Sequence, residues 1–172
     1  MNPFAQKMES LKSKIIRQSF GVTPVHLTED ELNSVETEIG YLLPQSYRDF
    51  LADYGGHIQG ACYPCIDNEG YKFNANINIF YGVFNSSPYK FSTSVDLLRN
   101  FRSTKGERPD DILPIGDNTG PGITCMRLSG EFAGTIYFWD RVDFYNAEDY
   151  HDLFWVCDSF EAFMEMLKSD EP

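Results

Sequence analysis

The sequence of 172 residues is poor in histidine, cysteine and basic side chains. It contains three histidines and four cysteines, and 14 lysines and arginines stand against 26 aspartates and glutamates. So few cysteines exclude a disulfide framework for a chain of this length, and they leave little material for a zinc centre. The formal net charge of −12 disfavours direct binding to nucleic acid, whose phosphates are neutralised by lysine and arginine.

Long hydrophobic runs are also missing. No stretch approaches the roughly 18 to 20 apolar residues that cross a membrane, and the N-terminus lacks the apolar core of a secretion signal. We therefore expect a cytoplasmic protein with no membrane segment. Hydrophobic residues make up 42% of the chain and aromatic residues 15%, which is enough for a folded core. The length fits one domain that spans residues 1–172.

The charge is distributed unevenly. The first 17 residues carry a net charge of +3, whereas residues 131–172 contain eleven acids against Arg141 and Lys168. The last quarter of the chain therefore has a net charge of −9, which repels phosphates and attracts cationic protein surfaces. The alternative explanation is that surplus acid only maintains solubility.

Residues 1–22 are predicted to form a helical extension. An asparagine followed by a proline is typical of a helix start, and apolar side chains then recur at helical spacing at Phe4, Met8, Leu11 and Ile15. The other face of this helix is basic, and we expect it to pack on the acidic body of the protein.

Further helices have recognisable starts and ends. Thr28 and Glu31 predict a capping box, and Gly40 is typical of a left-handed helix end. A second helix is predicted to begin at Pro44 and to stop at Gly55. A middle helix and a C-terminal helix are predicted by two further capping pairs, Thr93 with Asp96 and Asp158 with Glu161.

Short runs rich in β-formers alternate with glycine-containing turns in the second half of the chain. We predict strands within residues 77–81, 112–115, 123–128, 135–139 and 153–157, with residues 129–134 joining an antiparallel hairpin. The predicted fold is α+β: a single domain with a mostly antiparallel or mixed central sheet, flanked by N-terminal helices, a middle helix and a C-terminal helix.

Patterns that would indicate catalysis are weak. The glycine-rich residues 116–122 lack the Gly-Lys-Ser/Thr ending of a phosphate loop and precede a strand. Cys62 and Cys65 are surrounded by glycine and proline, which favours a loop over a zinc or redox site. His151 lies near acids, as in an ordinary surface ion pair. We predict no enzyme, no catalytic residue, no metal and no cofactor.

A basic series follows the middle helix. Four basic residues recur at three-residue spacing, and we interpret them as a solvated helix face balanced by neighbouring acids: Arg99, Arg102, Lys105 and Arg108.

Five short motifs follow one another along the chain. They are residues 43–51 (LPQSYRDFL) before Tyr54-Gly55-Gly56, then Phe80-Tyr81-Gly82, residues 113–117 (LPIGD), residues 134–140 (GTIYFWD) and residues 158–163 (DSFEAF). In this order and spacing the sequence resembles the SUKH superfamily, whose fungal founders are the Smi/Knr regulators of cell-wall synthesis. The resemblance covers residues 27–167.

The resemblance implies a function that composition does not reveal. Bacterial members look like immunity proteins that each bind and neutralise a cognate toxin domain, often a nuclease. An acidic protein suits the basic groove of such a nuclease, so we expect a basic partner and inhibition by stoichiometric occlusion. Two alternatives stay open: a regulatory scaffold of the Smi/Knr type, and a small-ligand protein built around residues 116–122 and the cysteine pair.

The predicted partner-binding residues lie after the hairpin. Exposed acids interspersed with aromatic side chains are typical of interface hot spots, and here they are Asp140, Asp143, Tyr145, Glu148, Asp149, Tyr150 and Asp152.

Overall fold

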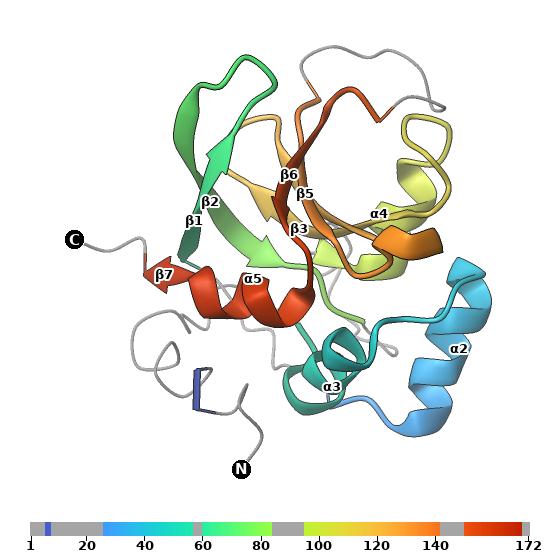
Figure 1. Cartoon of the computed structure of the whole chain (residues 1–172). Helices are drawn as coiled ribbons and strands as arrows, with labels where there is room; N and C mark the ends of the chain where they lie inside the picture. Colours follow the sequence, from blue (N-terminus) through green and yellow to red (C-terminus); the bar gives the residue numbers. More distant parts are fainter. Residues whose placement is uncertain (1–5, 8–25, 57–59, 84–94, 142–149, 170–172) are drawn as a thin grey trace.

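The computed structural model describes residues 6–7, 26–56, 60–83, 95–141 and 150–169. Within them it confirms the α+β fold, with helices around one antiparallel sheet (Figure 1). The helices are α2 (Glu29–Ile39), α3 (Gln45–Tyr54), α4 (Leu97–Ser103), the 3-10 turn η3 (Gly130–Phe132) and α5 (Phe160–Met166). The strands are β1 (Ala61–Ile66), β2 (Lys72–Phe80), β3 (Ile112–Asn118), β4 (Ile123–Arg127), β5 (Ile136–Trp139), β6 (Leu153–Cys157) and β7 (Lys168–Ser169). The predicted helical extension lies outside the described residues, apart from residues 6–7.

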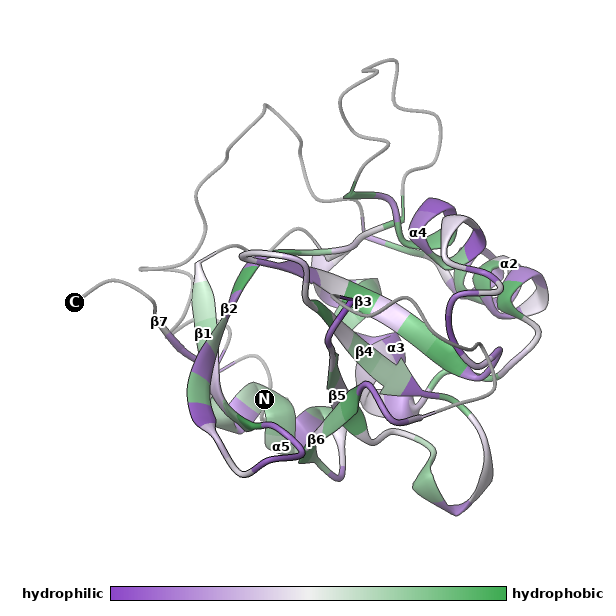
Figure 2. Ribbon diagram, turned by 90° about the horizontal axis from the view of Figure 1, so that it is seen from above, coloured by the Kyte–Doolittle hydropathy of each residue, from purple (hydrophilic) through white to green (hydrophobic). Residues whose placement is uncertain are grey.

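The sheet has the strand order β6-β5-β4-β3-β2-β1-β7, and every described pair is antiparallel. It is strongly curved (Figures 1 and 2). Curvature brings β1 against β6 although the two strands are not hydrogen-bonded neighbours. Helices α2 and α4 pack side by side on the side of the molecule away from β1, β2 and β7 (Figure 2).

Aromatic side chains form the centre of the main core. Phe160 of α5 lies 5.0 Å from the ring of Tyr47 and 5.2 Å from that of Phe50, both in α3. Phe163, one helical turn later, lies 5.0 Å from Tyr63 of β1. Edge-to-face and tilted pairs of this kind add to the free energy gained by burying the rings. They join both helices to the sheet.

A second, smaller core covers the outer face of the sheet. Residues alternate between the two faces of a strand, so those excluded from the main core gather on the other side. The buried members are Ile112, Ile123, Cys125, Trp139 and Leu153, and Tyr137 packs against them half-buried.

The predicted helix ends are confirmed at α2 and α3, whereas the starts of α4 and α5 are displaced. Thr28 and Glu31 form the reciprocal capping box, and Gly40 closes α2 with φ of 83°. In contrast, Asp96 itself caps α4, so this helix begins later than the predicted Thr93 start. At α5 the cap is Ser159, which accepts from the backbone N–H of Ala162, and not the predicted Asp158.

The two glycines after α3 have different physical reasons. Gly55 ends the helix in the left-handed conformation, with φ of 64°. Gly56 lies against the end of β2, where an added Cβ would stand 2.4 Å from the carbonyl oxygen of Tyr81 and 2.7 Å from the Cα of Gly82. A side chain at position 56 would therefore separate α3 from the sheet.

The cysteine pair lies in a strand, contrary to the predicted loop. Cys62 and Cys65 both belong to β1 and pair with Asn76 and Phe73 of β2. Because strand residues three apart point to opposite faces, the two thiols do not converge on one site. Pro64 between them is exposed, and proline is tolerated here because β1 lies near the edge of the sheet.

A closed ring of hydrogen bonds lies buried inside the sheet. Tyr63 shares a 2.8 Å hydrogen bond with the hydroxyl of Thr124, which also lies 2.7 Å from the amide oxygen of Asn118. The Asn118 amide donates back to Tyr63 over 3.4 Å. All three side chains are at most 1% exposed, so each polar group depends on the others. Burial raises the pKa of the Tyr63 phenol far above its usual value.

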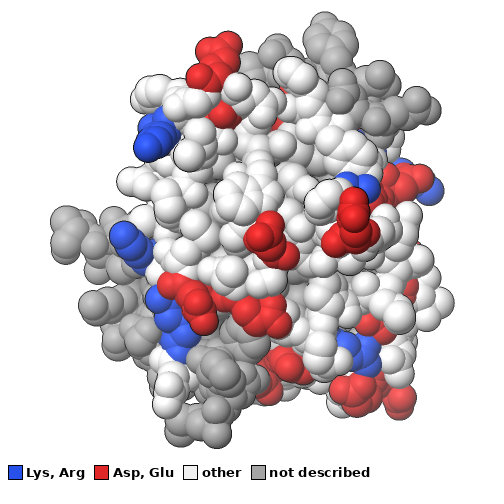
Figure 3. Space-filling view, viewed as in Figure 1, with Lys and Arg blue, Asp and Glu red and all other residues white. Residues whose placement is uncertain are grey.

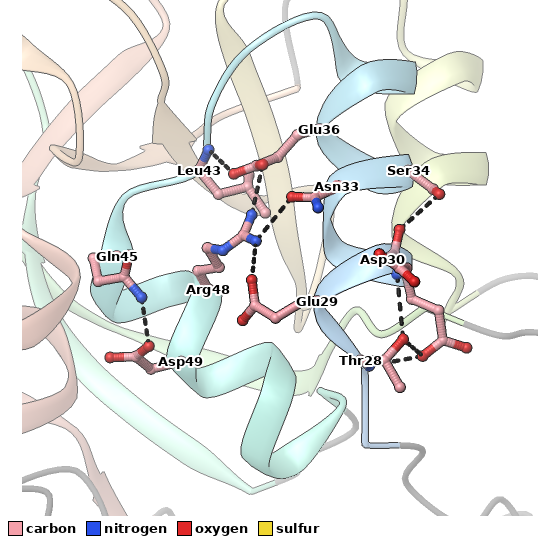
Figure 4. A network of polar contacts seen from close by, with 11 residues as sticks. Thr28, Glu29, Asp30, Asn33, Ser34, Glu36, Leu43, Gln45, Arg48 and Asp49 are labelled. Atoms are coloured by element: carbon pink, nitrogen blue, oxygen red, sulfur yellow. Dashed lines mark hydrogen bonds and ion pairs between the residues drawn. The ribbon is translucent and has the colours of Figure 1, made fainter.

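Helices α2 and α3 are joined by a buried carboxylate (Figure 4). Glu36 accepts hydrogen bonds from the backbone N–H of Leu43 at 2.9 Å and from Arg48 at 2.5 Å. The same guanidinium reaches the exposed Glu29 at 2.6 Å and Asn33 at 3.0 Å. Glu36 thereby fixes the linker between the helices and the angle at which they meet.

Two buried tyrosines give opposite predictions for removal of a hydroxyl. Tyr47 is fully buried, and its hydroxyl has no hydrogen-bond partner among the described residues, whereas that of Tyr63 belongs to the ring described above. We expect Tyr47→Phe to leave the free energy of unfolding unchanged or to raise it, and Tyr63→Phe to lower it by about 1–3 kcal/mol. Urea unfolding of both variants measures this, and an equal loss in both would contradict it.

The Arg48 cluster predicts a contrast between a buried and an exposed ion pair. Arg48→Met leaves the Glu36 carboxylate buried without its cation, and we expect a loss of about 3 kcal/mol in the free energy of unfolding. Glu29→Gln removes a partner whose side chain is 78% exposed, and we expect a loss below about 1 kcal/mol. Similar losses in the two variants, measured by urea unfolding, would show that burial of Glu36 does not set the cost.

Candidate partner-binding surface

Three of the predicted binding residues lie together at one end of the sheet. Asp140 follows β5, and its backbone N–H donates to the carbonyl of Asp152 at 3.0 Å. Tyr150 precedes β6 and is 37% exposed. The other four, Asp143, Tyr145, Glu148 and Asp149, lie outside the described residues, so the structure does not test them.

Tyr150 is anchored to a buried carboxylate that the sequence did not single out. Its hydroxyl donates to Asp111 at 2.7 Å, at the start of β3. The other oxygen of Asp111 accepts from Ser129 at 2.7 Å and from Arg127 at 2.9 Å. Three segments far apart in sequence therefore meet at Asp111: the entry to β3, the exit of β4 and the approach to β6.

These contacts displace two pKa values in opposite directions. Burial alone raises the pKa of Asp111, but the three hydrogen bonds and the positive charge of Arg127 outweigh it, so its pKa lies below the usual range. Burial and the hydrogen bond to Asp111 raise the pKa of Tyr150 to about 12. The carboxylate is therefore charged and the phenol neutral near neutral pH.

Arg127 lies between aromatic rings. Its guanidinium carbon is 4.6 Å from the ring centroid of Tyr150 and 5.5 Å from that of Phe132, which is itself 50% exposed. A pocket of about 660 Å³ opens beside this cluster. Its lining includes acidic side chains, basic side chains and two tyrosines: Tyr41, Lys105, Gly106, Arg108, Pro109, Asp110, Asp111, Arg127, Ser129 and Tyr150.

The basic series around α4 is only partly a solvated face. Arg102 pairs with Glu38 of α2 at 2.7 Å, as predicted for a helix face balanced by acids. Arg108, however, is 2% exposed and donates to the hydroxyl of Thr104 and to the carbonyls of Phe101 and Pro109. Burial lowers the pKa of its guanidinium. Arg108 therefore holds the α4–β3 loop in place.

An exposed tryptophan extends this surface across the outer face of the sheet. Trp155 of β6 is 57% exposed and pairs in register with Tyr137 of β5. Tyr137 in turn is opposite Cys125, two residues before Arg127. We name these side chains the aromatic strip: Phe132, Tyr137, Tyr150 and Trp155, with Arg127.

Apart from Tyr150, the members of the strip were missed, and for those on strands the reason is that apolar and polar residues do not alternate in the sequence. Residues 153–157 (LFWVC) are apolar throughout, so the pattern does not reveal which side chain faces outward.

The described residues contain no group of three histidines, cysteines, aspartates or glutamates placed to hold a metal ion. His151 lies 3.2 Å from Asp152 with its side chain 74% exposed, the ordinary surface pair that was expected. Among these residues no helix has both the length and the apolar character to cross a membrane.

Asp111 predicts a pH dependence of stability. Its pKa in the folded state lies below that in the unfolded chain, about 3.9, so its contribution is complete above that value and is lost as pH falls through the folded pKa. We expect the difference in free energy of unfolding between wild type and Asp111→Asn to be constant from pH 7 to about 5 and to shrink below about 4. Urea unfolding at several pH values measures it; a difference independent of pH would contradict the assignment.

Comparison with known proteins gives a family and one curated relative. The chain is 28% identical over 161 aligned residues, 84% of its own length and 76% of the relative's, to the SPbeta prophage-derived uncharacterized protein YokK of Bacillus subtilis (strain 168). A family model described as SMI1 / KNR4 family (SUKH-1) matches residues 26–166, which include every described strand except β7. The match covers most of the sequence and confirms the resemblance read from its motifs: the chain belongs to the SMI1/KNR4 family (SUKH-1).

Proposed function

We propose that this protein is an immunity protein that binds a cognate toxin domain, a basic nuclease, and blocks it by stoichiometric occlusion. The observation that carries the proposal is the acidity of the last quarter of the chain, with a net charge of −9 over residues 131–172. A nuclease groove must be basic to hold phosphates, so it offers a complementary surface. Family membership supports a binding role of this kind.

The acidity is spread over the molecule. Acidic side chains lie mainly across the middle and lower part of the face seen in Figure 3, with basic side chains among them. Basic side chains elsewhere in the described residues are engaged by acids, as in the pairs Arg102–Glu38 and Arg141–Glu107. A field of one sign over a broad face speeds the encounter with a cationic partner, and close contacts then decide which partner stays bound.

We propose that the close contacts are made at the end of the sheet that carries Asp140, Tyr150 and Asp152, together with the segment 142–149 that joins them. Tyr150 is suited to this role because its hydroxyl is fixed by Asp111 and one ring face contacts Arg127. A side chain already held in place loses little conformational freedom on binding.

The alternative built on the glycine-rich residues has less support. Gly122 lies against the ring of Phe138, where an added Cβ would stand 2.1 Å from a ring atom, and Gly116 lies close to the backbone of β2. Packing therefore accounts for these glycines without a ligand. The other alternative is a regulatory scaffold of the Smi/Knr type. The pull-down described next distinguishes a scaffold from an immunity protein.

The test is an affinity pull-down of the full chain from its native cell, washed in parallel at low and high salt. One near-stoichiometric toxin-like protein, lost more readily in high salt, is expected. Growth of cells that express that toxin should then depend on co-expression of this chain. Several weakly held partners would instead favour a scaffold, and a thermal shift with a small molecule would favour a ligand-binding protein.

Replacing the acids of the proposed contact segment tests how the partner is attracted. We expect Asp143→Asn, Glu148→Gln, Asp149→Asn and Asp152→Asn together to slow association with the captured toxin about tenfold and to flatten its salt dependence. Stopped-flow or surface-based kinetics measures the rate.

The matched control removes four exposed acids of the α2–α3 region, at Glu29, Asp30, Glu38 and Asp53, for the same change in net charge. Equal slowing in both variants would mean that only the total charge matters, and no slowing in either would remove this segment from the interface.

A further inference from the structure

Trp155 is an exposed tryptophan with a fixed orientation. It lies in β6, which is one edge strand of the sheet, β7 being the other. Its side chain is on the outer face beside Tyr137. At 57% exposure it offers much of its ring to solvent, whereas Trp139, two residues from Tyr137 on the same face, is 6% exposed. Leaving this much apolar surface in water is a cost that an interaction site would recover.

The polar end of this ring is already satisfied. The indole Nε1–H donates to Oδ1 of Asp158 at 3.0 Å, across the turn between β6 and α5. A carboxylate can accept about four hydrogen bonds, so this one contact leaves Asp158, which is exposed, with further capacity. The result is a flat π surface with a carboxylate fixed at its edge.

The surroundings are acidic. Residues 153–167 contain Asp158, Glu161 and Glu165 and no lysine or arginine. All three are exposed, and the two glutamates lie in α5, which follows β6 directly. Lys7 contacts α5 near its C-terminal end, where its Nζ donates to the carbonyl oxygen of Glu165 at 2.9 Å. The charge beside the indole is the carboxylate of Asp158, and this charge favours a cation.

We propose, resting on the proposed function, that Trp155 and Asp158 form a receptor for an arginine side chain of the toxin. A planar guanidinium can stack on the indole while its N–H groups donate to the carboxylate, a geometry that the ammonium of lysine does not match. The rest of the aromatic strip, Tyr137, Arg127, Phe132 and Tyr150, continues the contact with tyrosine, phenylalanine and arginine, residue types suited to the buried centre of protein interfaces. Trp155 is its anchor.

The first experiment needs no toxin. The probe is a hexaarginine peptide, titrated into the full chain while tryptophan emission is recorded, with Trp155→Phe as the blank that retains only Trp139. We expect a saturable change that is absent from Trp155→Phe, smaller with hexalysine, and weakened about fivefold by Asp158→Asn. Asp30→Asn, which removes an exposed acid from α2, should bind like wild type.

Three results of this titration would overturn the proposal. They are no change in emission up to millimolar peptide, the same change in Trp155→Phe, and equal weakening by Asp30→Asn and Asp158→Asn. Sedimentation of wild type and Trp155→Ala provides a further check, because a dimer that depends on Trp155 would assign the ring to a second copy of this chain.

The second experiment uses the toxin domain captured by the pull-down, with its activity removed. We expect Trp155→Ala to weaken binding about 30-fold or more and Leu42→Ala, which removes an exposed apolar side chain between α2 and α3, to change it less than threefold. Equal affinity of Trp155→Ala and wild type would refute the receptor while leaving immunity intact. If wild type binds no toxin but Trp155 still responds to hexaarginine, the proposed function fails and the arginine receptor stands.

Discussion

The contact of α3 and α5 with the concave side of the sheet is the constraint on which the rest of the structure depends. The rings of Tyr47, Phe50 and Phe160 meet there, and Phe163 carries the contact onward to Tyr63 and so to β1. Because these rings fill the space enclosed by the curved sheet, the sheet cannot flatten without exposing them. Its curvature, in turn, brings β1 against β6 and fixes what faces outward.

Filling one face in this way leaves the other face available for binding. The outer side has only a small core, and at its margins the side chains emerge into solvent as the aromatic strip. At one end of the strip, Asp111 accepts hydrogen bonds from Arg127, Ser129 and Tyr150. At the other end, Asp158 accepts a hydrogen bond from the indole of Trp155 and so fixes its orientation. Each carboxylate fixes aromatic side chains that would otherwise have to be ordered when a partner binds.

Much of the fold was predictable from the sequence because local signals and burial agree. The Thr28 capping box, the Gly55 helix end and the hairpin of β4 and β5 were all recognised from residue type and spacing. Two helix starts were misplaced because serine, threonine and aspartate compete as caps within one turn. Cys62 and Cys65 were assigned to a loop because the flanking glycines and Pro64 hid a strand near the sheet edge.

The candidate surface was less predictable for a different reason. Tyr150 was recognised, but its partner Asp111 lies 39 residues away, and contacts at such separation leave no periodic trace. Arg108 looked like a surface charge because its spacing matched that of exposed neighbours, and its burial arises from the path of the α4–β3 loop.

The position of α5 has a consequence for synthesis of the chain. Phe160 and Phe163 are fully buried at the centre of the main core, yet they follow the other described core strands in sequence. While the ribosome is still making the earlier strands, the concave face lacks these rings, and β1 lacks its pairing with β7. The sheet therefore completes its core only after residues 160–169 have emerged from the exit tunnel, and until then the earlier strands lack the rings that fill their concave face.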